Sequence, residues 1–207
     1  MDTAELSPPL QQLAALILAS PHNLVSRAAR EELESRHIPE SMRLAMQLPR
    51  SERHLRLLDV GSGGGLPGLV IALERPDLEV NLLDAKQKKV EFLRQAASAL
   101  GLRVTVHHGR AEELARTELA GRFDLVTARA VAPLDRLLPW TVPFLRPGGL
   151  LYAVKGERWE QELLEARPAL EAGGATVVET PDTAQSSGEE GPKVILIARS
   201  VPQENTR

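Results

Sequence analysis

Alternating glycines and two aspartates form the clearest chemical pattern in this sequence. Gly61, Gly63 and Gly65 follow a short apolar run, and Asp59 stands two residues before the first glycine. Glycine lets the backbone turn sharply and approach a ligand closely, and the free N–H groups at a following helix start attract polar ligand edges. The next apolar run ends at Asp84, whose carboxylate could accept hydrogen bonds from two ribose hydroxyls. The pattern predicts a nucleotide-binding strand–turn–helix unit.

The spacing of the loop distinguishes three ligand classes. A phosphate-binding P-loop needs Gly-Lys-Ser/Thr at its end, but Leu69 follows Gly68. The dinucleotide fingerprint needs a third glycine where Leu66 stands. Glycines that alternate after an aspartate are instead similar to the first motif of Rossmann-like methyltransferases that use S-adenosylmethionine. A glycine turn without any ligand remains the alternative.

The composition limits the possible functions. The chain has 207 residues, of which 43% are hydrophobic and 26% charged, enough for one well-packed α/β domain with an appendage. It has no cysteine, which excludes disulfides, thiolate metal sites and cysteine nucleophiles. No stretch has the length of a membrane span and the N-terminus does not resemble a signal peptide, so we expect a cytoplasmic protein. The net charge of −3 means that an RNA partner would need a local basic surface.

Alternating strand and helix patterns predict an α/β fold of the Rossmann-like class, with a seven-stranded, mostly parallel sheet flanked by helices. The predicted strands are 55–60, 79–83, 104–108, 123–128, 150–155, 176–179 and 194–198. The predicted helices between them are 66–74, 86–100, 112–119, 134–144 (broken by Pro139 and Pro143) and 157–172.

We expect an N-terminal helical appendage in residues 1–52, a cofactor-binding domain in 53–200 and a flexible tail in 201–207. The appendage helices are predicted at 10–18, 27–37 and 41–48, and Ser26 could cap the second. The polar loop 180–192 is expected to be mobile. The appendage carries Arg36 and His37 among glutamates, which fits either an RNA-facing surface or a solvated helix face.

Further candidate residues follow the ends of predicted strands, where ligands bind in this architecture. Ala111 and Glu112 follow the third strand and could hold an adenine through a backbone N–H and a carboxylate. Glu112 could instead only favour the start of a helix. Arg129 follows the fourth strand and Lys155 ends the fifth. Each could face a reaction cleft, or be an ordinary charge at a strand end.

Longer motifs resemble the bacterial 16S ribosomal RNA (guanine-N7) methyltransferase family, also called glucose-inhibited division protein B. The matching segments lie in the family's order and spacing at residues 58–68, 83–85, 88–93, 109–113, 128–132 and 155–156. The Leu-Pro-Gly and Ala-Arg-Ala elements are distinctive beyond methyltransferases in general. Residues 23–26 and 36–41 resemble the family's Asn-Leu-Thr and Arg-His-Ile-x-Asp-Ser segments.

The resemblance implies an enzyme that transfers a methyl group from S-adenosylmethionine to N7 of a guanosine in 16S rRNA, with that RNA or the small ribosomal subunit as partner. It implies cofactor contacts at Gly61, Leu66, Asp84, Ala85, Ala111, Glu112 and Arg129, to which the glycine loop adds Gly63. No metal is expected. We assign no catalytic residue, because guanine N7 has a free lone pair and no base must remove a proton from it.

We expect contacts with RNA from Arg129, Lys155, Lys88 and Lys193. The basic residues of the helix after Asp84, which are Lys86, Lys88, Lys89 and Arg94, could add attraction for the RNA backbone or be simply solvated. Lys193 stands where the family commonly has arginine, and lysine lacks arginine's planar fork. Glu40 replaces the family's aspartate, and Leu18 stands at its tryptophan position.

Two other functions remain open from the sequence. The chain could be a methyltransferase for a small molecule, or a ribosome-assembly factor that binds the cofactor without catalysis. The sequence does not determine the oligomeric state, for which a monomer is the simplest expectation.

Overall fold

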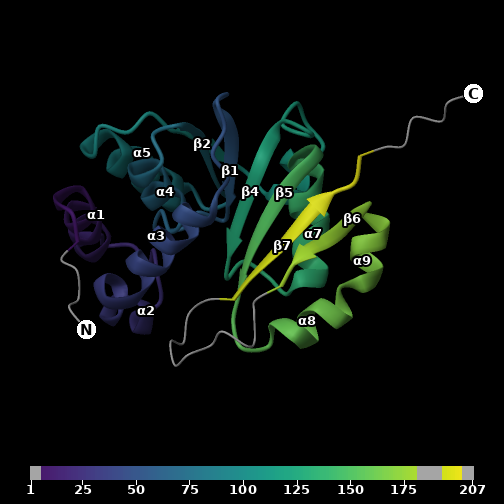
Figure 1. The fold of residues 1–207 in the computed structure, drawn as a ribbon. Helices are drawn as coiled ribbons and strands as arrows, with labels where there is room; N and C mark the ends of the chain where they lie inside the picture. Colours follow the sequence, from purple (N-terminus) through teal and green to yellow (C-terminus); the bar gives the residue numbers. More distant parts are fainter. Residues whose placement is uncertain (1–5, 181–192, 202–207) are drawn as a thin grey trace, which may run out of the picture. The chain divides into compact units, whose positions relative to one another are not determined.

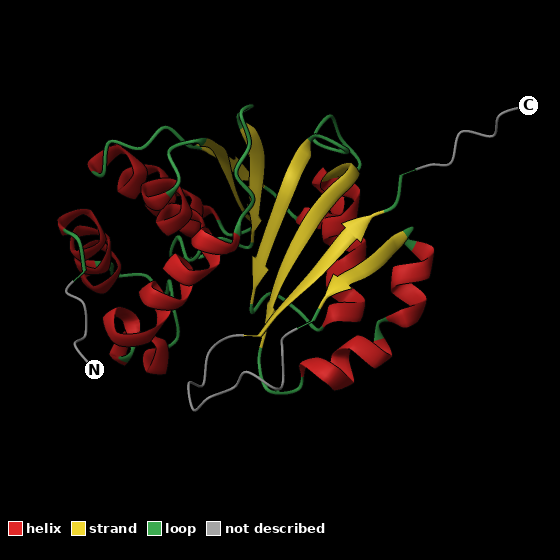
Figure 2. Cartoon of the chain, viewed as in Figure 1, coloured by secondary structure: helices red, strands yellow, loops and turns green. Residues whose placement is uncertain are grey.

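A computed structural model describes residues 6–180 and 193–201. The chain folds as two compact units, residues 1–110 and 111–207. Figure 1 follows both along the sequence, and Figure 2 distinguishes their helices and strands. Most of the loop 180–192 and most of the tail 201–207, for which mobility was predicted, lie outside the described residues.

The first unit combines the N-terminal helices with three parallel strands. Its elements are α1 (Pro8–Ala19), α2 (Arg27–Glu31), the π-helix η1 (Leu33–His37), α3 (Ile38–Gln47), β1 (Leu55–Val60), α4 (Gly68–Glu74), β2 (Leu78–Asp84), α5 (Gln87–Ala99) and β3 (Thr105–His108). The strand order is β3-β2-β1. Leu57 pairs with Val80, and Leu82 pairs with Val106.

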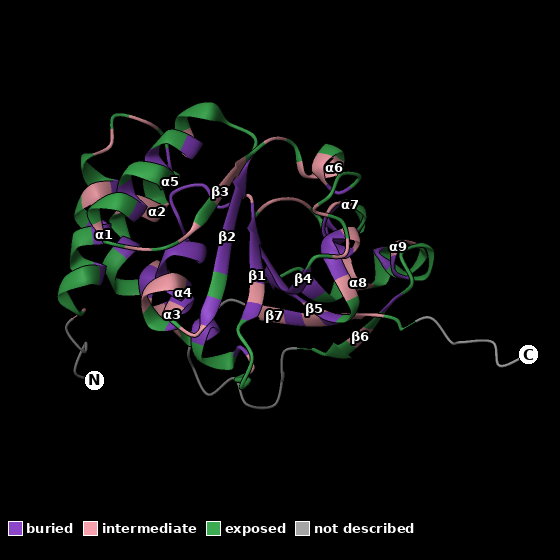
Figure 3. Ribbon diagram, turned by 90° about the horizontal axis from the view of Figure 1, so that it is seen from above, coloured by how far each residue is buried: buried purple, intermediate pink, exposed green. Residues whose placement is uncertain are grey.

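The core of this unit lies between β1, β2 and the helices after them. Leu57, Leu58 and Leu82 are fully buried in the strands, and Leu69 and Ile71 of α4 are equally buried. Such nearly continuous apolar runs are typical of parallel strands covered on both faces. In Figure 3, β1 and β2 are accordingly mostly buried. The residues that follow the carboxyl ends of these strands are therefore attached to a well-packed core.

Arg75 fastens the N-terminal helices to the strand-bearing part of the first unit. Its side chain is only 4% exposed. It donates to the carbonyl oxygens of Ala45 at 3.0 Å, Leu48 at 2.8 Å and Pro49 at 2.8 Å, in the region of the α3 C-terminus where carbonyls lack helical partners. The same guanidinium donates twice to Asp77, at 2.8 and 2.7 Å. These hydrogen bonds, and then the charge of Arg75, lower the pKa of the Asp77 carboxyl.

The second unit contains four strands and the helices between them. Its elements are α6 (Ala111–Leu114), β4 (Phe123–Arg129), α7 (Leu134–Thr141), the 3₁₀ helix η2 (Val142–Phe144), β5 (Leu145–Lys155), α8 (Trp159–Glu165), α9 (Arg167–Ala172), β6 (Ala175–Glu179) and β7 (Lys193–Arg199). The strand order is β4-β5-β7-β6. β4 and β5 are parallel, whereas β7 is antiparallel to both β5 and β6.

Two phenylalanines mark the core of the second unit. The rings of Phe123 and Phe144 are fully buried and meet edge to face, 6.2 Å apart. α7 packs on β5, and α9 packs on β6 and on α7. The two units thus supply the seven strands that the sequence predicts, five of them with a parallel partner.

Several predicted helices differ from those observed. The helix predicted at 27–37 is the short α2 followed by a π-helix, which runs directly into α3 at Ile38. The helix predicted at 157–172 is divided into α8 and α9 at Ala166, because Pro168 has no N–H to continue the first helix. The helix predicted at 112–119 is only the single turn 111–114.

In the second unit, the prolines and glycines led to wrong bounds for one helix and one strand. Pro139 does not break the predicted helix but lies inside α7, whereas Pro143 lies in the 3₁₀ helix after it. β5 begins at Leu145, five residues before the predicted start, and its pairing with β4 shifts register beyond Phe123. The irregular stretch that contains Gly148 and Gly149 therefore belongs to the strand. Such glycines in strands often accompany irregular pairing.

Candidate functional site

The glycine loop after β1 is held by the end of β2. The backbone N–H groups of Gly61 and Ser62 both donate to the carbonyl oxygen of Leu83, at 2.8 and 3.0 Å. The Ser62 hydroxyl donates to the Asp59 carbonyl and accepts from the N–H of Leu83. Gly61 and Gly63 have φ angles of +73° and +57°, which residues with a Cβ rarely adopt. The loop is therefore a preformed turn.

Asp59 links β1 to α4, the helix that follows the glycine loop. Its side chain is buried, and Oδ2 accepts a hydrogen bond from the N–H of Gly68 at 3.2 Å, at the first residue of α4. The carboxylate satisfies a helix N–H that has no partner within the helix. Asp59 therefore joins the strand to the helix after the loop.

Asp84 is the carboxylate next to the loop backbone. Its residue is 7% exposed at the end of β2. Oδ2 accepts from the Gly63 N–H at 2.9 Å, and Oδ1 accepts from the Lys86 N–H at 2.9 Å. Each carboxylate oxygen has about two acceptor sites, so each retains capacity for a hydroxyl donor. The arrangement fits a ribose diol, which needs two adjacent acceptors.

The other predicted cofactor contacts of this unit differ in exposure. Leu66 is buried within the turn before α4, whereas Ala85 is exposed directly after Asp84. Lys86 and Lys88 are exposed, and Lys89 is only partly exposed. Leu24 and Val25 contact the loop from the N-terminal segment: a Cβ on Gly64 would lie 3.3 Å from a side-chain carbon of each. No sequence motif predicts that these two residues contact the loop.

In the second unit, Ala111 and Glu112 open α6, and both are partly exposed. Arg129 ends β4, where its Nη1 is buried. The next residue, Ala130, has a φ of +53°, a conformation that costs a residue with a side chain on the order of 1–3 kcal/mol. The backbone after Arg129 therefore needs support from its surroundings.

Lys155 provides that support. Its side chain is 6% exposed, and Nζ lies 2.8 Å from Oε2 of Glu162 in α8 and 2.6 Å from the carbonyl oxygen of Ala132. The same Glu162 oxygen accepts from the N–H of Leu134, at the start of α7. This ion pair, in which Lys155 is buried and Glu162 partly exposed, thus holds the segment between Ala130 and α7 at Ala132 and Leu134. Glu162 gave no signal in the sequence, because it lies on a different element from its partner.

Cationic residues gather at one end of the strands of this unit. Arg129 pairs in the sheet with Val154, and Lys155 stands opposite Lys193 across β5 and β7. Like charges directly opposite repel, and Glu162 offsets this by its ion pair with Lys155. Three of the four residues predicted to contact RNA therefore lie at neighbouring strand ends. The fourth, Lys88, is on α5 of the first unit.

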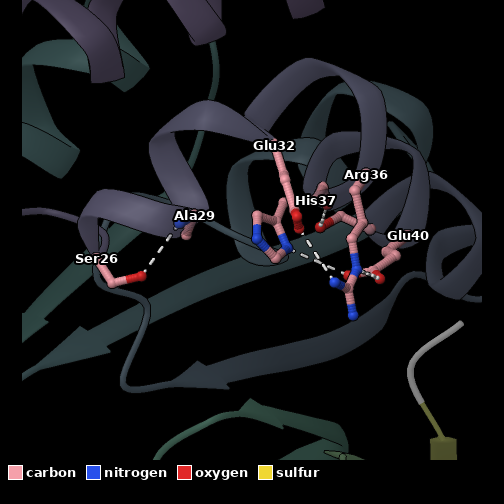
Figure 4. Close-up of polar contacts among 7 residues, drawn as sticks. Ser26, Ala29, Glu32, Arg36, His37 and Glu40 are labelled. Atoms are coloured by element: carbon pink, nitrogen blue, oxygen red, sulfur yellow. Dashed lines mark hydrogen bonds and ion pairs between the residues drawn. The ribbon is translucent and has the colours of Figure 1, made fainter. Parts of the chain in front are cut away.

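Arg36 and His37 of the N-terminal helices lie against acidic side chains (Figure 4). Arg36 donates to Glu40 at 2.8 Å and to Glu32 at 3.0 Å, and these bonds raise the pKa of its guanidinium. Nδ1 of His37 lies 3.3 Å from the second Glu40 oxygen. The Ser26 hydroxyl accepts from the Ala29 N–H at 3.2 Å, which confirms the predicted cap. Because two carboxylates offset its charge, Arg36 attracts RNA phosphates less than an unpaired arginine would.

A metal site and a membrane span are both without a candidate in the part of the chain that the structure describes. Within residues 6–180 and 193–201, no three histidine or acidic side chains are grouped so that they could hold a metal ion. None of the helices in those ranges is long and apolar enough to cross a membrane.

Residues 9–189 match the family model described as rRNA small subunit methyltransferase G. A ribosomal RNA small subunit methyltransferase G from Sorangium cellulosum is 45% identical over 179 residues, which cover 86% of this chain and 72% of the relative. The protein of that name from Mycolicibacterium smegmatis is 47% identical over 68% of this chain and 58% of its own. The chain belongs to the GidB family. Membership in the GidB family confirms the predicted enzyme class, an S-adenosylmethionine-dependent methyltransferase.

Solved structures confirm the fold class of this GidB-family chain. A mutant of MtNAS in complex with S-adenosylmethionine has a TM-score of 0.63 at 18% identity, covering 93% of this chain and 72% of its own. A candidate S-adenosyl-L-methionine-dependent methyltransferase from Methanococcus maripaludis has a TM-score of 0.63 at 16% identity, covering 84% of this chain and 91% of its own. Both similarities support the predicted Rossmann-like architecture.

Proposed function

We propose that this GidB-family protein transfers the methyl group of S-adenosylmethionine to N7 of a guanosine in small-subunit ribosomal RNA. The observation that carries the proposal is the identity of 45% with a ribosomal RNA small subunit methyltransferase G over 86% of the chain. The glycine loop and Asp84 lie within the matched residues 9–189. The cytoplasm, where ribosomes are assembled, is the expected location.

Asp84 and the glycine loop form the first part of the proposed cofactor site. The Asp84 carboxylate accepts hydrogen bonds from the ribose hydroxyls. Gly61 and Gly63 have positive φ angles and no Cβ, so the cofactor can approach their backbone. The contact of Asp84 with the Gly63 N–H holds the carboxylate in place. The same proposed site includes Leu66, which follows Gly63 in the sequence, and Ala85, which follows Asp84.

In the second unit, the residues proposed to contact the cofactor are Ala111, Glu112 and Arg129. The backbone N–H of Ala111 and the carboxylate of Glu112 suit a purine, which offers ring nitrogen acceptors and an exocyclic amine donor. Arg129 is assigned to the cofactor by the family resemblance, and to RNA because it ends a strand beside the cationic Lys155 and Lys193.

The reaction needs positioning more than acid–base chemistry. When bound, S-adenosylmethionine supplies an electrophilic methyl group on a sulfonium. Guanine N7 already has a free lone pair, so the protein's side chains have no proton to remove from the nucleophile. They must hold the base in line and exclude water, and such alignment can contribute about 7–11 kcal/mol. A buried, preformed loop next to Asp84 is suited to this task.

RNA binding is assigned to the cationic strand ends and to α5. Lys193 and Lys88 are accessible to phosphates, being partly exposed and exposed respectively. Phosphate contacts of this kind position an RNA without reading its sequence. Because the chain's net charge is −3, binding depends on this local excess and weakens as salt concentration rises.

Deletion of the gene from its host tests the proposed substrate. Small-subunit RNA from the deletion strain and its parent is reduced with borohydride and cleaved with aniline, which breaks the chain at 7-methylguanosine. We expect one cleavage site to disappear on deletion and to return with the wild-type gene but not with an Asp84→Ala gene. An unchanged cleavage pattern would contradict the RNA substrate, and methyl transfer restricted to small metabolites in the purified protein would favour a small-molecule enzyme.

A further inference from the structure

One lysine of α5 reaches over the glycine loop. A Cβ built on Gly63 would lie 3.6 Å from Nζ of Lys89 and 3.5 Å from the carbonyl oxygen of Leu24. The Gly63 N–H is itself bonded to Asp84 at 2.9 Å. A lysine ammonium, a carboxylate and a bare backbone therefore meet at Gly63, within the first unit.

The geometry of the helix explains why Lys89, and not its neighbour, occupies this position. α5 begins three residues after Asp84, and the N–H of Lys89 donates to the carbonyl of Lys86 at 2.9 Å in the first turn. Side chains of a helix lean toward its N-terminus, which for Lys89 is the direction of the loop. Lys88 is exposed on the same turn, whereas Lys89 is only partly exposed.

The ammonium of Lys89 has no carboxylate partner among the described residues, since no ion pair with it is found in residues 6–180 or 193–201. A positive charge held beside the loop suits an anionic group of a ligand. A ligand whose ribose is bound by Asp84 lies next to Gly63, because those two residues are in contact.

We propose that Lys89 binds the α-carboxylate of the methionyl group of the cofactor. This assignment rests on the proposed cofactor site at Asp84. The methionyl group is joined to the ribose, and the α-carboxylate is the only anion that S-adenosylmethionine and S-adenosylhomocysteine possess. A compact ammonium on a flexible stem can follow that carboxylate as the cofactor binds. Lys89 then contributes to cofactor selection, while Lys88 remains assigned to RNA.

A pair of ligands tests the proposal without RNA or turnover. S-Adenosylhomocysteine carries the carboxylate, and 5′-methylthioadenosine keeps the adenosine and sulfur but lacks the amino-acid end. Isothermal titration measures both ligands against the wild type, Lys89→Met, Lys89→Arg and the matched control Lys88→Met. Methionine keeps the length of the lysine stem, and thermal unfolding monitors the fold of each variant.

We expect Lys89→Met to weaken S-adenosylhomocysteine about 10- to 100-fold, the range for a hydrogen bond to a charged group. The same variant leaves 5′-methylthioadenosine unchanged, Lys89→Arg restores part of the loss, and Lys88→Met alters neither ligand. Equal losses for both ligands would overturn the proposal, because a lysine that only supports the loop or Asp84 affects them alike. Unchanged binding of S-adenosylhomocysteine would also overturn it.

The outcome is separable from the proposed function. A wild type that binds neither ligand would overturn both the cofactor site and the role of Lys89. A wild type that shows the expected ligand-specific loss but does not methylate ribosomal RNA would overturn only the RNA substrate. A Lys89→Met variant with weaker RNA binding and normal S-adenosylhomocysteine binding would assign the lysine to phosphate instead, against the proposal.

Discussion

Replacement of Gly68 by alanine is expected to destabilise the protein through steric overlap alone. Gly68 begins α4, and its φ is not positive, so alanine can adopt its backbone conformation without strain. A Cβ there would lie 2.4 Å from Cδ2 of Leu82, 2.7 Å from Oδ2 of Asp59 and 3.0 Å from Cβ of Asp59. Leu82 is fully buried and Asp59 nearly so, so neither can move aside easily.

The size of the effect follows from opposing contributions. Overpacking of a filled core costs about 1–3 kcal/mol, and displacement of Asp59 also weakens its hydrogen bond from the Gly68 N–H. Better helix propensity returns at most about 1 kcal/mol. We expect a net loss of about 2 kcal/mol, which lowers the Tm by about 4–8 °C for a chain of this size. Cofactor affinity should also fall, because Asp59 precedes the glycine loop.

Thermal unfolding followed by circular dichroism measures this change, and Gly156→Ala is the matched control. A Cβ on Gly156 would meet nothing within 4 Å, and its φ is also not positive. The control should be neutral or more stable by up to about 1 kcal/mol, through the unfolded state. A Gly68→Ala protein with a Tm within about 1 °C of the wild type would show that the site accommodates a Cβ, against the expected steric overlap.

Three further substitutions test other contacts. Asp84→Asn should weaken S-adenosylhomocysteine by ~1–3 kcal/mol in isothermal titration, because the amide loses the charge and one acceptor oxygen; equal affinity would contradict the ribose contact. Asp77→Asn should cost ~1 kcal/mol at pH 7, since the Asp77 side chain is 39% exposed beside Arg75. Because folding lowers the pKa of Asp77 from its ordinary 3.8, this contribution should disappear in urea titrations as the pH falls below that value; a pH-independent difference would contradict it. Lys155→Met should cost ~1–3 kcal/mol in urea unfolding, because Glu162 loses its cationic partner and, among the described residues, keeps only the Leu134 N–H, and the double variant with Glu162→Leu should recover part of it; an unaffected single variant would oppose the pairing.

Local signals predicted the parts of the fold that depend on neighbouring residues. The apolar run and glycines placed β1 at Leu55–Val60, as observed, and the positive φ angles fall on Gly61, Gly63 and Gly65. The serine before α2 caps it as expected. Each of these features depends on a few consecutive residues, so it can be predicted from the local sequence.

Contacts between distant elements could not be predicted in the same way. Lys155 and Glu162 belong to a strand and a separate helix, and nothing in their spacing indicates that they form a buried pair. Lys88 and Lys89 are adjacent residues of the same type, so the sequence alone does not distinguish them. Only the orientation of α5 shows that Lys88 is exposed and that Lys89 lies next to the loop. The π-helix before α3 likewise has no simple sequence signal.

Nucleoside mass spectrometry of small ribosomal subunits tests the proposed methylation of guanosine N7 most directly. Purified protein is incubated with methyl-deuterated S-adenosylmethionine and subunits from the deletion strain, and the RNA is digested to nucleosides. We expect deuterated 7-methylguanosine from the wild type and a strong reduction with Asp84→Ala. Label absent from 7-methylguanosine, or found in another nucleoside, would contradict it.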